Sequence, residues 1–400
     1  MTMSVPSHVP QNLVVDYDIF NLPTNTGLDP QQIWRIFKGH GPLVFSPYNG
    51  GHWIATDGQD VFKFFREPTV FSSRQVAIPS VPDDDVMLPI QADAPTHSQH
   101  RANIQSLFSP AAVAALEPKI RALTVDLIEG FRQKGECEFV SEFALQFPLV
   151  IFLRMVDLPL DDRLYLRDII ERFNHSPSVE TKVAAHKELH EYLAGWIDRR
   201  LANPGQDAIS HITRGTIEGR PYTRDEMISS LTLLLHAGLD TVAMMLSFLA
   251  YHLARFPKDR AYVRNNRDRM PQIIQEFLRR YAVPNLARIL ATDYTHKGVV
   301  MKKGDRIFLP QSLFNMDEEL QENPDEVNFS RPDPRHITFG AGPHTCAGAL
   351  LARREIAIFL EEWLDRIPEF EVDSARPPKL QATQQNNIFE LWLTWPVSAH

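Results

Sequence analysis

The stretch of sequence that decides the fold reads Phe339-Gly340-Ala341-Gly342-Pro343-His344-Thr345-Cys346-Ala347-Gly348. Strong helix formers follow it from Ala349 to Glu355, so Cys346 stands at the N-terminal end of a predicted helix. The helix dipole and the unpaired N–H groups there favour a thiolate, and the glycines let the backbone approach a flat ligand closely. A lone cysteine is more often a small buried hydrophobic residue. This context instead favours an iron–thiolate bond.

Proline and glycine residues, together with the spacing of hydrophobic residues, predict which parts of the remaining chain are strands, helices or irregular segments. Hairpins are predicted in Pro42–Gly58, around Asn49-Gly50-Gly51, and in Gly298–Pro310, around Lys303-Gly304. Apolar residues recur at helical spacing from Pro110 to Phe256, and strand-like alternation returns from Ile388 to Pro396. Asn323–Arg335 is a proline-punctuated meander. Without a repeat or a linker, the sequence predicts a single, mostly α domain over residues 1–400 with a minor β lobe.

Composition narrows the class of protein. The 400 residues carry 41 Lys plus Arg against 50 Asp plus Glu, a net charge of −9, which disfavours a nucleic-acid partner. The N-terminus lacks a signal-peptide pattern, and no run reaches the roughly 18 apolar residues of a membrane span. We therefore expect a cytoplasmic protein with no membrane anchor. Cys137 and Cys346 are the two cysteines, too few for a disulfide framework or a thiolate zinc cluster, and Cys137 is interpreted as structural.

A second unusual run is His236-Ala237-Gly238-Leu239-Asp240-Thr241, inside an apolar helical segment from Ile228 to Leu253. Glycine costs about 1 kcal/mol relative to alanine in a helix, and threonine can bond back to a carbonyl. Such a local conflict often marks a functional site. Taken alone, the run fits a kinked core helix with one satisfied polar pair equally well.

Charged side chains elsewhere are weaker signals. Glu276 and Arg279 form an i, i+3 pair that is, by itself, a common surface ion pair of little energy. His97 and Arg101 share a helix face, and Arg288 follows Arg279 by nine residues (288 − 279). For each single cation, a solvated surface position is the more common explanation.

Together these runs resemble the cytochrome P450 family. Residues 339–348 fill every fixed position of its signature Phe-Gly-x-Gly-x-His-x-Cys-x-Gly, and Ala237–Thr241 matches its Ala/Gly-Gly-x-Asp/Glu-Thr pattern. The resemblance implies that Cys346 ligates the iron of heme b, that Phe339 shields the sulfur and that His344 binds a propionate. The central helix should open beside the haem, where Asp240 and Thr241 pass protons to the oxygen-activation site.

The same resemblance assigns the charged residues. Glu276, Arg279 and Arg331 correspond to a structural ion-pair network that holds the haem-binding core. Asp93–Arg101 resembles the family's Asp-Pro-x-x-His-x-x-x-Arg segment, with Ala94 in place of the usual proline. His97, Arg101 and Arg288 are then expected to bind the haem propionates.

Similarity is closest to the bacterial camphor hydroxylase subfamily. It implies a soluble enzyme that takes electrons from a [2Fe-2S] ferredoxin served by a reductase and hydroxylates a small terpenoid. The tyrosine that anchors camphor in that subfamily is missing, because Phe71–Arg101 contains no tyrosine and the corresponding loop is Val81–Pro89. We expect a terpenoid-like or norisoprenoid ketone of ionone type. The expected substrate contacts are Met87, Leu233, His236, Ala237 and Pro284.

His236 has a second interpretation, in which its ring bonds a neighbouring backbone carbonyl rather than the substrate. Two other functions are also considered, a haem-thiolate binding or sensor protein and a relative that uses peroxide. The Asp240-Thr241 pair argues against both. For an acidic ferredoxin we expect a basic patch near the thiolate, with His100, Arg101 and Arg335 as candidates.

Overall fold

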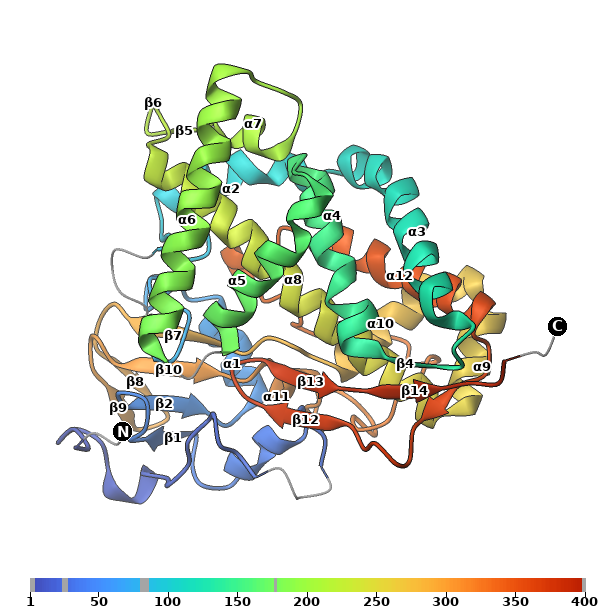
Figure 1. Ribbon diagram of the computed structural model, residues 1–400. Coiled ribbons are helices and arrows are strands. Elements are labelled where there is room, and N and C mark those ends of the chain that lie inside the picture. Colours follow the sequence, from blue (N-terminus) through green and yellow to red (C-terminus); the bar gives the residue numbers. More distant parts are fainter. Residues whose placement is uncertain (1–3, 24–27, 80–85, 176–177, 398–400) are drawn as a thin grey trace.

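In the computed structural model, a broad layer of helices lies over a smaller region of β-sheets (Figure 1). The described residues are 4–23, 28–79, 86–175 and 178–397. Their α-helices are α1 (Gly58–Phe65), α2 (Thr96–Gln105), α3 (Pro110–Arg132), α4 (Gln146–Val156), α5 (Arg163–His175), α6 (Val179–Ala202), α7 (Ala208–Ile212), α8 (Arg224–Arg255), α9 (Pro257–Asn265), α10 (Met270–Arg280), α11 (Gln311–Asn315) and α12 (Ala349–Arg366). The prediction of a mostly α fold with a minor β lobe is confirmed.

The strands belong to several small sheets. They are β1 (Leu43–Ser46), β2 (His52–Ala55), β3 (Phe71–Ser72), β4 (Glu136–Glu138), β5 (Thr216–Ile217), β6 (Arg220–Pro221), β7 (Leu286–Leu290), β8 (Tyr294–His296), β9 (Val299–Met301), β10 (Arg306–Leu309), β11 (Glu371–Val372), β12 (Lys379–Ala382), β13 (Asn386–Glu390) and β14 (Trp392–Thr394). A five-stranded sheet has the order β1-β2-β10-β7-β3. The tail alternation is confirmed, since β13 pairs with β12 and β14 pairs with β11 and β4.

The two predicted hairpins had different outcomes. The first is confirmed as the antiparallel pair β1–β2, whose turn residues Asn49, Gly50 and Gly51 all have positive φ. For the second hairpin, the prediction that Lys303-Gly304 forms the turn between two paired strands is wrong. β9 pairs with β8, while β10 pairs with β2 and β7. Lys303-Gly304 therefore links two sheets, because pairing of β10 with β2 and β7 outweighs pairing with the adjacent β9. The predicted helical region is likewise interrupted by β4 and by the β5–β6 pair.

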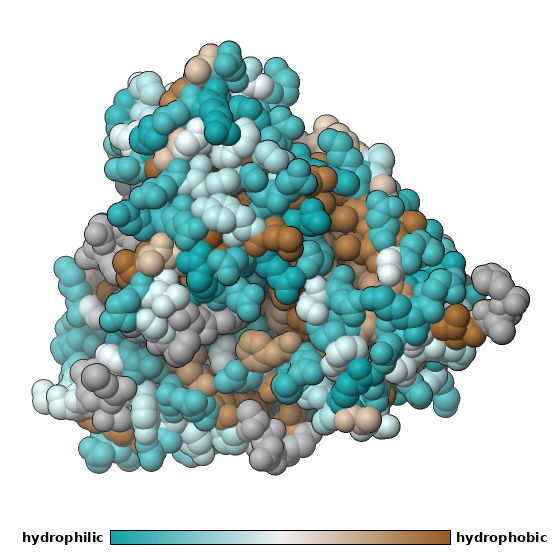
Figure 2. Space-filling model, in the orientation of Figure 1, coloured by the Kyte–Doolittle hydropathy of each residue, from teal (hydrophilic) through white to brown (hydrophobic). Residues whose placement is uncertain are grey.

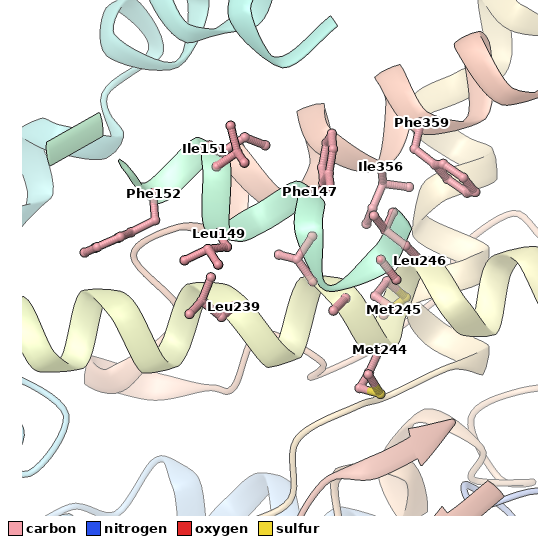
Figure 3. Packing of buried hydrophobic residues seen from close by; sticks show 14 of the residues in the cluster. Phe147, Leu149, Ile151, Phe152, Leu239, Met244, Met245, Leu246, Ile356 and Phe359 are labelled. Atoms are coloured by element: carbon pink, nitrogen blue, oxygen red, sulfur yellow. The ribbon is translucent and has the colours of Figure 1, made fainter. Parts of the chain in front are cut away.

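Helix α8 lies at the centre of the helical layer. It begins with a capping box between Thr223 and Glu226, and most of its following residues are buried. Figure 3 shows residues 239 and 244–246 of α8 among side chains of α4, such as Phe147, and of α12, such as Phe359. Among the described residues, α8 is the one helix long and apolar enough to cross a membrane, but 72 % of its most apolar segment is buried in the fold. It is a core helix here.

The Glu276–Arg279 pair is not on the surface. The side chains of Glu276 and Arg279 are 1 % and 0 % exposed and their closest charged atoms are 2.8 Å apart. Arg331 Nε lies 3.1 Å from the same carboxylate. The Arg279 guanidinium also donates to the carbonyls of Asn315, Pro324 and Glu326. This buried and fully bonded network ties α10 to the meander that leads to the cysteine loop.

Candidate haem-thiolate site

The backbone between Phe339 and Cys346 folds back on itself. The Cys346 N–H donates to the Phe339 carbonyl at 2.8 Å. Gly342 has φ +73°, and a Cβ there would lie 2.8 Å from the Phe65 carbonyl oxygen, so only glycine fits without a shift. This close contact fixes the loop against the end of α1 and brings Cys346 to the start of α12.

The thiol of Cys346 lies deep in the fold but is not covered. Its residue is exposed by surface area, yet the surrounding fold removes enough water from the thiol for burial to raise its pKa. The N–H groups of Gly348 and Ala349 and the cations Arg101 and Arg353 lower the pKa, but less than burial raises it. A metal cation on the open side of the sulfur would deprotonate it. The N–H groups at the helix end lower the pKa of the thiol, as predicted, but burial has the larger effect on that pKa.

Four basic side chains meet beside this loop. The rings of His97 and His344 are 4.0 Å apart. Burial, together with nearby His97, Arg288 and Arg101, lowers the pKa of His344 to about 3. Burial likewise lowers the pKa of Arg288 to about 10. The structure therefore brings together the four residues that the sequence predicted as propionate ligands.

Arg288 has no ion pair with a carboxylate among the described residues. It is 2 % exposed, donates to the Ala287 carbonyl at 2.7 Å and lies 4.9 Å from the centre of the Phe65 ring. A buried guanidinium without an anion is costly. An anionic group such as a propionate would offset that cost, so the residues present fit heme b.

Phe339 is half-buried and lies under the guanidinium of Arg353, which is 4.5 Å from the ring centre. Arg353 in turn donates to the Ala349 carbonyl in the first turn of α12. The Phe339 ring is therefore held, through Arg353, beside the first turn of the helix that follows the cysteine.

On α8, an exposed segment interrupts a buried helix. Between Met227 and Ala254, Ala237 and Gly238 are the exposed residues. The helix is continuous from Arg224 to Arg255, so the predicted opening is not a break in the helix. The Thr241 hydroxyl donates to the Ala237 carbonyl at 2.7 Å, and the side chain thus supplements the backbone bonding at the unusual run.

A cleft of about 1570 Å³ lies between α8 and its neighbours. Leu239, Asp240 and Met244 of α8 face side chains of α5, α6 and the segment that joins β12 to β13. The face drawn in Figure 2 is hollowed near its centre, where apolar atoms lie among hydrophilic ones. The cleft is wide enough for an organic ligand and reaches the predicted acid residue.

The predicted substrate contacts do not gather around one cavity. None of the five is among the cleft-lining residues of the described chain. His236 lies with Nδ1 2.9 Å from the Thr232 carbonyl and packs on Phe173 at 4.8 Å, as its second interpretation expected. The neighbours of Met87, Val86 and Leu88, line a separate cavity of about 480 Å³.

Leu233 is buried on α8, whereas Ala237 is exposed. Pro284 forms a β-bridge with Gln385, and it is Gln385 that lines the cleft. Part of the loop Val81–Pro89, namely residues 81–85, lies outside the described residues.

Sequence reasoning missed most of the cleft wall. Thr383, Gln384 and Gln385 line it from the β12–β13 turn and Asn387 lines it from β13. The polar run Gln384-Gln385-Asn386-Asn387 inside an alternating tail was an available signal. His100 was also misassigned as a surface cation. It is 5 % exposed and lies 2.7 Å from the Tyr222 hydroxyl, because a short histidine ring is easily covered by a neighbouring hairpin. Arg335 is exposed and pairs with Asp333.

A cysteine at a helix end, a cluster of basic side chains beside it and a long core helix facing an organic-ligand cleft define a haem-thiolate enzyme. A family model described as "Cytochrome P450" matches residues 161–390. The "Probable cytochrome P450 127A1" of Sinorhizobium fredii is 32 % identical over 405 residues, covering 98 % of this chain and 97 % of that protein. The chain belongs to the cytochrome P450 family, and it is a heme b monooxygenase.

Other relatives cover the chain as fully. "Cytochrome P450-terp" of Pseudomonas sp is 28 % identical over 423 residues, which are 95 % of each chain. The crystal structure of CYP101J2 matches with a TM-score of 0.92 and 35 % identity, covering 99 % of this chain and all of that one. The crystal structure of CYP101C1 gives 0.91 and 37 %, covering 98 % and all.

Proposed function

We propose that this monooxygenase hydroxylates a small apolar, terpenoid-like substrate, and more narrowly a norisoprenoid ketone of ionone type. The observation that carries the proposal is the cleft of about 1570 Å³ beside Leu239, Asp240 and Met244. Ligand pockets are commonly about 300–1000 Å³. The cleft therefore has room for a substrate larger or flatter than camphor, in agreement with the missing tyrosine in Phe71–Arg101.

Cys346 is proposed as the residue whose thiolate would hold the iron of heme b. Thiolate ligation supplies electron density that favours O–O bond cleavage when the cofactor is bound. His97, Arg101, Arg288 and His344 would hold the propionates by charge-assisted hydrogen bonds. Phe339 and the Arg353 guanidinium above it would restrict water near the sulfur.

Asp240 and Thr241 are proposed to deliver protons. Asp240 of α8 is half-buried and lines the cleft. The Thr241 hydroxyl donates to the Ala237 carbonyl, which leaves its oxygen available to accept a hydrogen bond from a water molecule and so to position that water. A carboxylate and a hydroxyl in this order form a short relay at neutral pH.

Electrons are proposed to come from a [2Fe-2S] ferredoxin and its reductase. The face around the cysteine loop carries the half-buried Arg101 and the exposed Arg66 and Arg335, and Arg66 is adjacent to Gly342 of the loop. An acidic ferredoxin would be attracted to these cations. A single domain spanning residues 1–400 and a cytoplasmic location are part of the same proposal.

The test combines a spectrum with turnover. Ferrous protein with CO should give the red-shifted Soret band of thiolate ligation, and Cys346→Ser should lose it. A histidine-type spectrum in the wild type would contradict the ligand assignment. Ionones should convert the protein from low spin to high spin and drive NADH consumption with a ferredoxin system. Tight binding and single-product oxidation of camphor would contradict the substrate proposal.

A further inference from the structure

Two histidines face the cleft from α6, the helix that packs on α5 and α8 (Figure 1). His186 and His190 are four residues apart (190 − 186), and both line the cleft. The centres of their rings are 3.9 Å apart and the ring planes are inclined by 57°. Side chains at positions i and i+4 are neighbours on one helix face. The α6 wall of the cleft therefore presents two imidazole rings side by side.

The spacing of the two rings suits a single metal ion. In a tetrahedral zinc site, Zn–N distances of about 2.0–2.1 Å place two nitrogen ligands about 3.4 Å apart. Rings whose centres are 3.9 Å apart bring one nitrogen each to that separation by small side-chain rotations. Two histidines at i and i+4 on a helix are also the pair that binds zinc in helical metal motifs. The geometry thus provides half of a tetrahedral ligand set.

The surroundings of the pair hold one ring in place and balance their own formal charges. Phe173 of α5 packs on the His186 ring at 5.3 Å and on the His236 ring of α8 at 4.8 Å. The described residues that line the cleft include three cations and three carboxylates, namely Arg167, Lys182, Lys187, Glu171, Glu191 and Asp240. Because these charges balance, the two imidazole rings, rather than the charge of the wall, determine which ion binds.

We propose that His186 and His190 form a binding site for a divalent transition-metal ion of the Zn²⁺, Ni²⁺ or Cu²⁺ type in the wall of the cleft. Imidazole suits these ions, whereas Mg²⁺ and Ca²⁺ prefer oxygen ligands. The described part of the chain contains no group of three or more His, Cys, Asp and Glu residues that could hold a metal ion. Water or a cleft ligand therefore completes the coordination, and the ion exchanges readily, unlike a structural zinc with four protein ligands.

A metal ion at this position has two consequences for the protein. It joins positions i and i+4 of α6, and an ion that binds only the folded state stabilises that state as its concentration rises. It also occupies part of the cleft that an organic ligand would fill, so metal and ligand compete. The site uses none of the proposed haem ligands, and the inference goes beyond the proposed function.

The test is equilibrium dialysis of Zn²⁺ against the haem-loaded protein without an affinity tag, in which the cofactor would occupy Cys346 and the His97–His344 pair. His186→Ala and His190→Ala should each weaken Zn²⁺ binding about 10²-fold, because the second imidazole acts at a high effective concentration. Mg²⁺ should not displace the ion. X-ray absorption at the zinc edge of the wild type, which needs no variant, should show two imidazole ligands.

His40→Ala is the matched control, because His40 is exposed and is not among the described cleft-lining residues; it should leave the Zn²⁺ affinity unchanged. Equal affinity in the wild type and in both cleft variants, or a spectrum with a single imidazole, would refute the site.

Two further readouts test the consequences. Zn²⁺ should raise the thermal unfolding midpoint of the wild type but not that of His190→Ala. With any ionone that shifts the spin state, Zn²⁺ should raise the apparent dissociation constant of the ionone, and an unchanged constant at saturating Zn²⁺ would refute the placement of the ion in the cleft. If no ionone binds, the proposed substrate class is wrong, while the metal site stands or falls on the dialysis and the zinc-edge spectrum.

Discussion

Replacing Glu276 by alanine tests whether the buried ion-pair network holds the haem-binding core. The carboxylate accepts from Arg279 at 2.8 and 2.9 Å, from Arg331 at 3.1 and 3.3 Å and from the Asn328 N–H at 2.8 Å. Glu276→Ala leaves the Arg279 and Arg331 side chains, 0 % and 6 % exposed, without their counter-charge. Breaking such a pair costs about 3–5 kcal/mol, a large part of the roughly 5–15 kcal/mol that stabilises a folded domain.

The assay is urea unfolding of the haem-loaded protein, followed at once by the Soret band and by helical circular dichroism. The midpoint should fall by an amount equivalent to about 3–5 kcal/mol, with haem lost at or before the loss of helix. Asp333→Ala is the control, because the Asp333–Arg335 pair is 68 % and 59 % exposed and such pairs contribute about 0–1 kcal/mol. Equal midpoints for the two variants would refute the structural role of the network.

Three further predictions concern chemistry, pH and partner binding. Thr241→Ala should keep NADH consumption but divert it to hydrogen peroxide, and Asp240→Asn should slow kcat by about 10²; normal coupling and rate in both would remove them from the relay. Burial raises the pKa of Glu355 from 4.5 to about 8, so only the unfolded chain ionises between these values and stability falls as the pH rises from about 4.5 to 8. At about 1.4 kcal/mol per unit this is on the order of 5 kcal/mol, and Glu355→Gln should flatten the pH dependence of the unfolding midpoint; an unchanged slope contradicts the assignment. Arg335→Glu should weaken the salt dependence of ferredoxin reduction, and an unaltered dependence would place Arg335 outside the docking surface.

The parts of the site that depend on local sequence could be predicted. Short segments with a recognisable spacing of residues carry the cysteine loop, the polar run of α8 and the charged residues around them. The structure brings His97, Arg101, Arg288 and His344 together as expected. Their proposed roles await the spectra and variants described above.

The cleft wall could not be predicted in the same way. Gln385 reaches its place through pairing of β12 with β13 and through the bridge to Pro284, about a hundred residues away (385 − 284). The Lys303-Gly304 turn fails for the same reason, because β10 pairs with β2 and β7 rather than with β9, the strand next to it in sequence. Non-local pairing of this kind carries no signature in a short stretch of sequence.

The ribosome makes the two parts of the site, the cysteine loop and the β12–β13 wall of the cleft, at different times. The cysteine loop precedes α12, whereas the turn that closes the cleft follows it, and Asn387 comes 41 residues after Cys346 (387 − 346). At about 5–20 residues per second, a ribosome delivers the metal-binding loop roughly 2–8 s before the strands that complete the cleft. The loop that carries Cys346 is therefore present in the growing chain before the strands that form the β12–β13 wall of the cleft, and these strands are among the last parts of the site to be made.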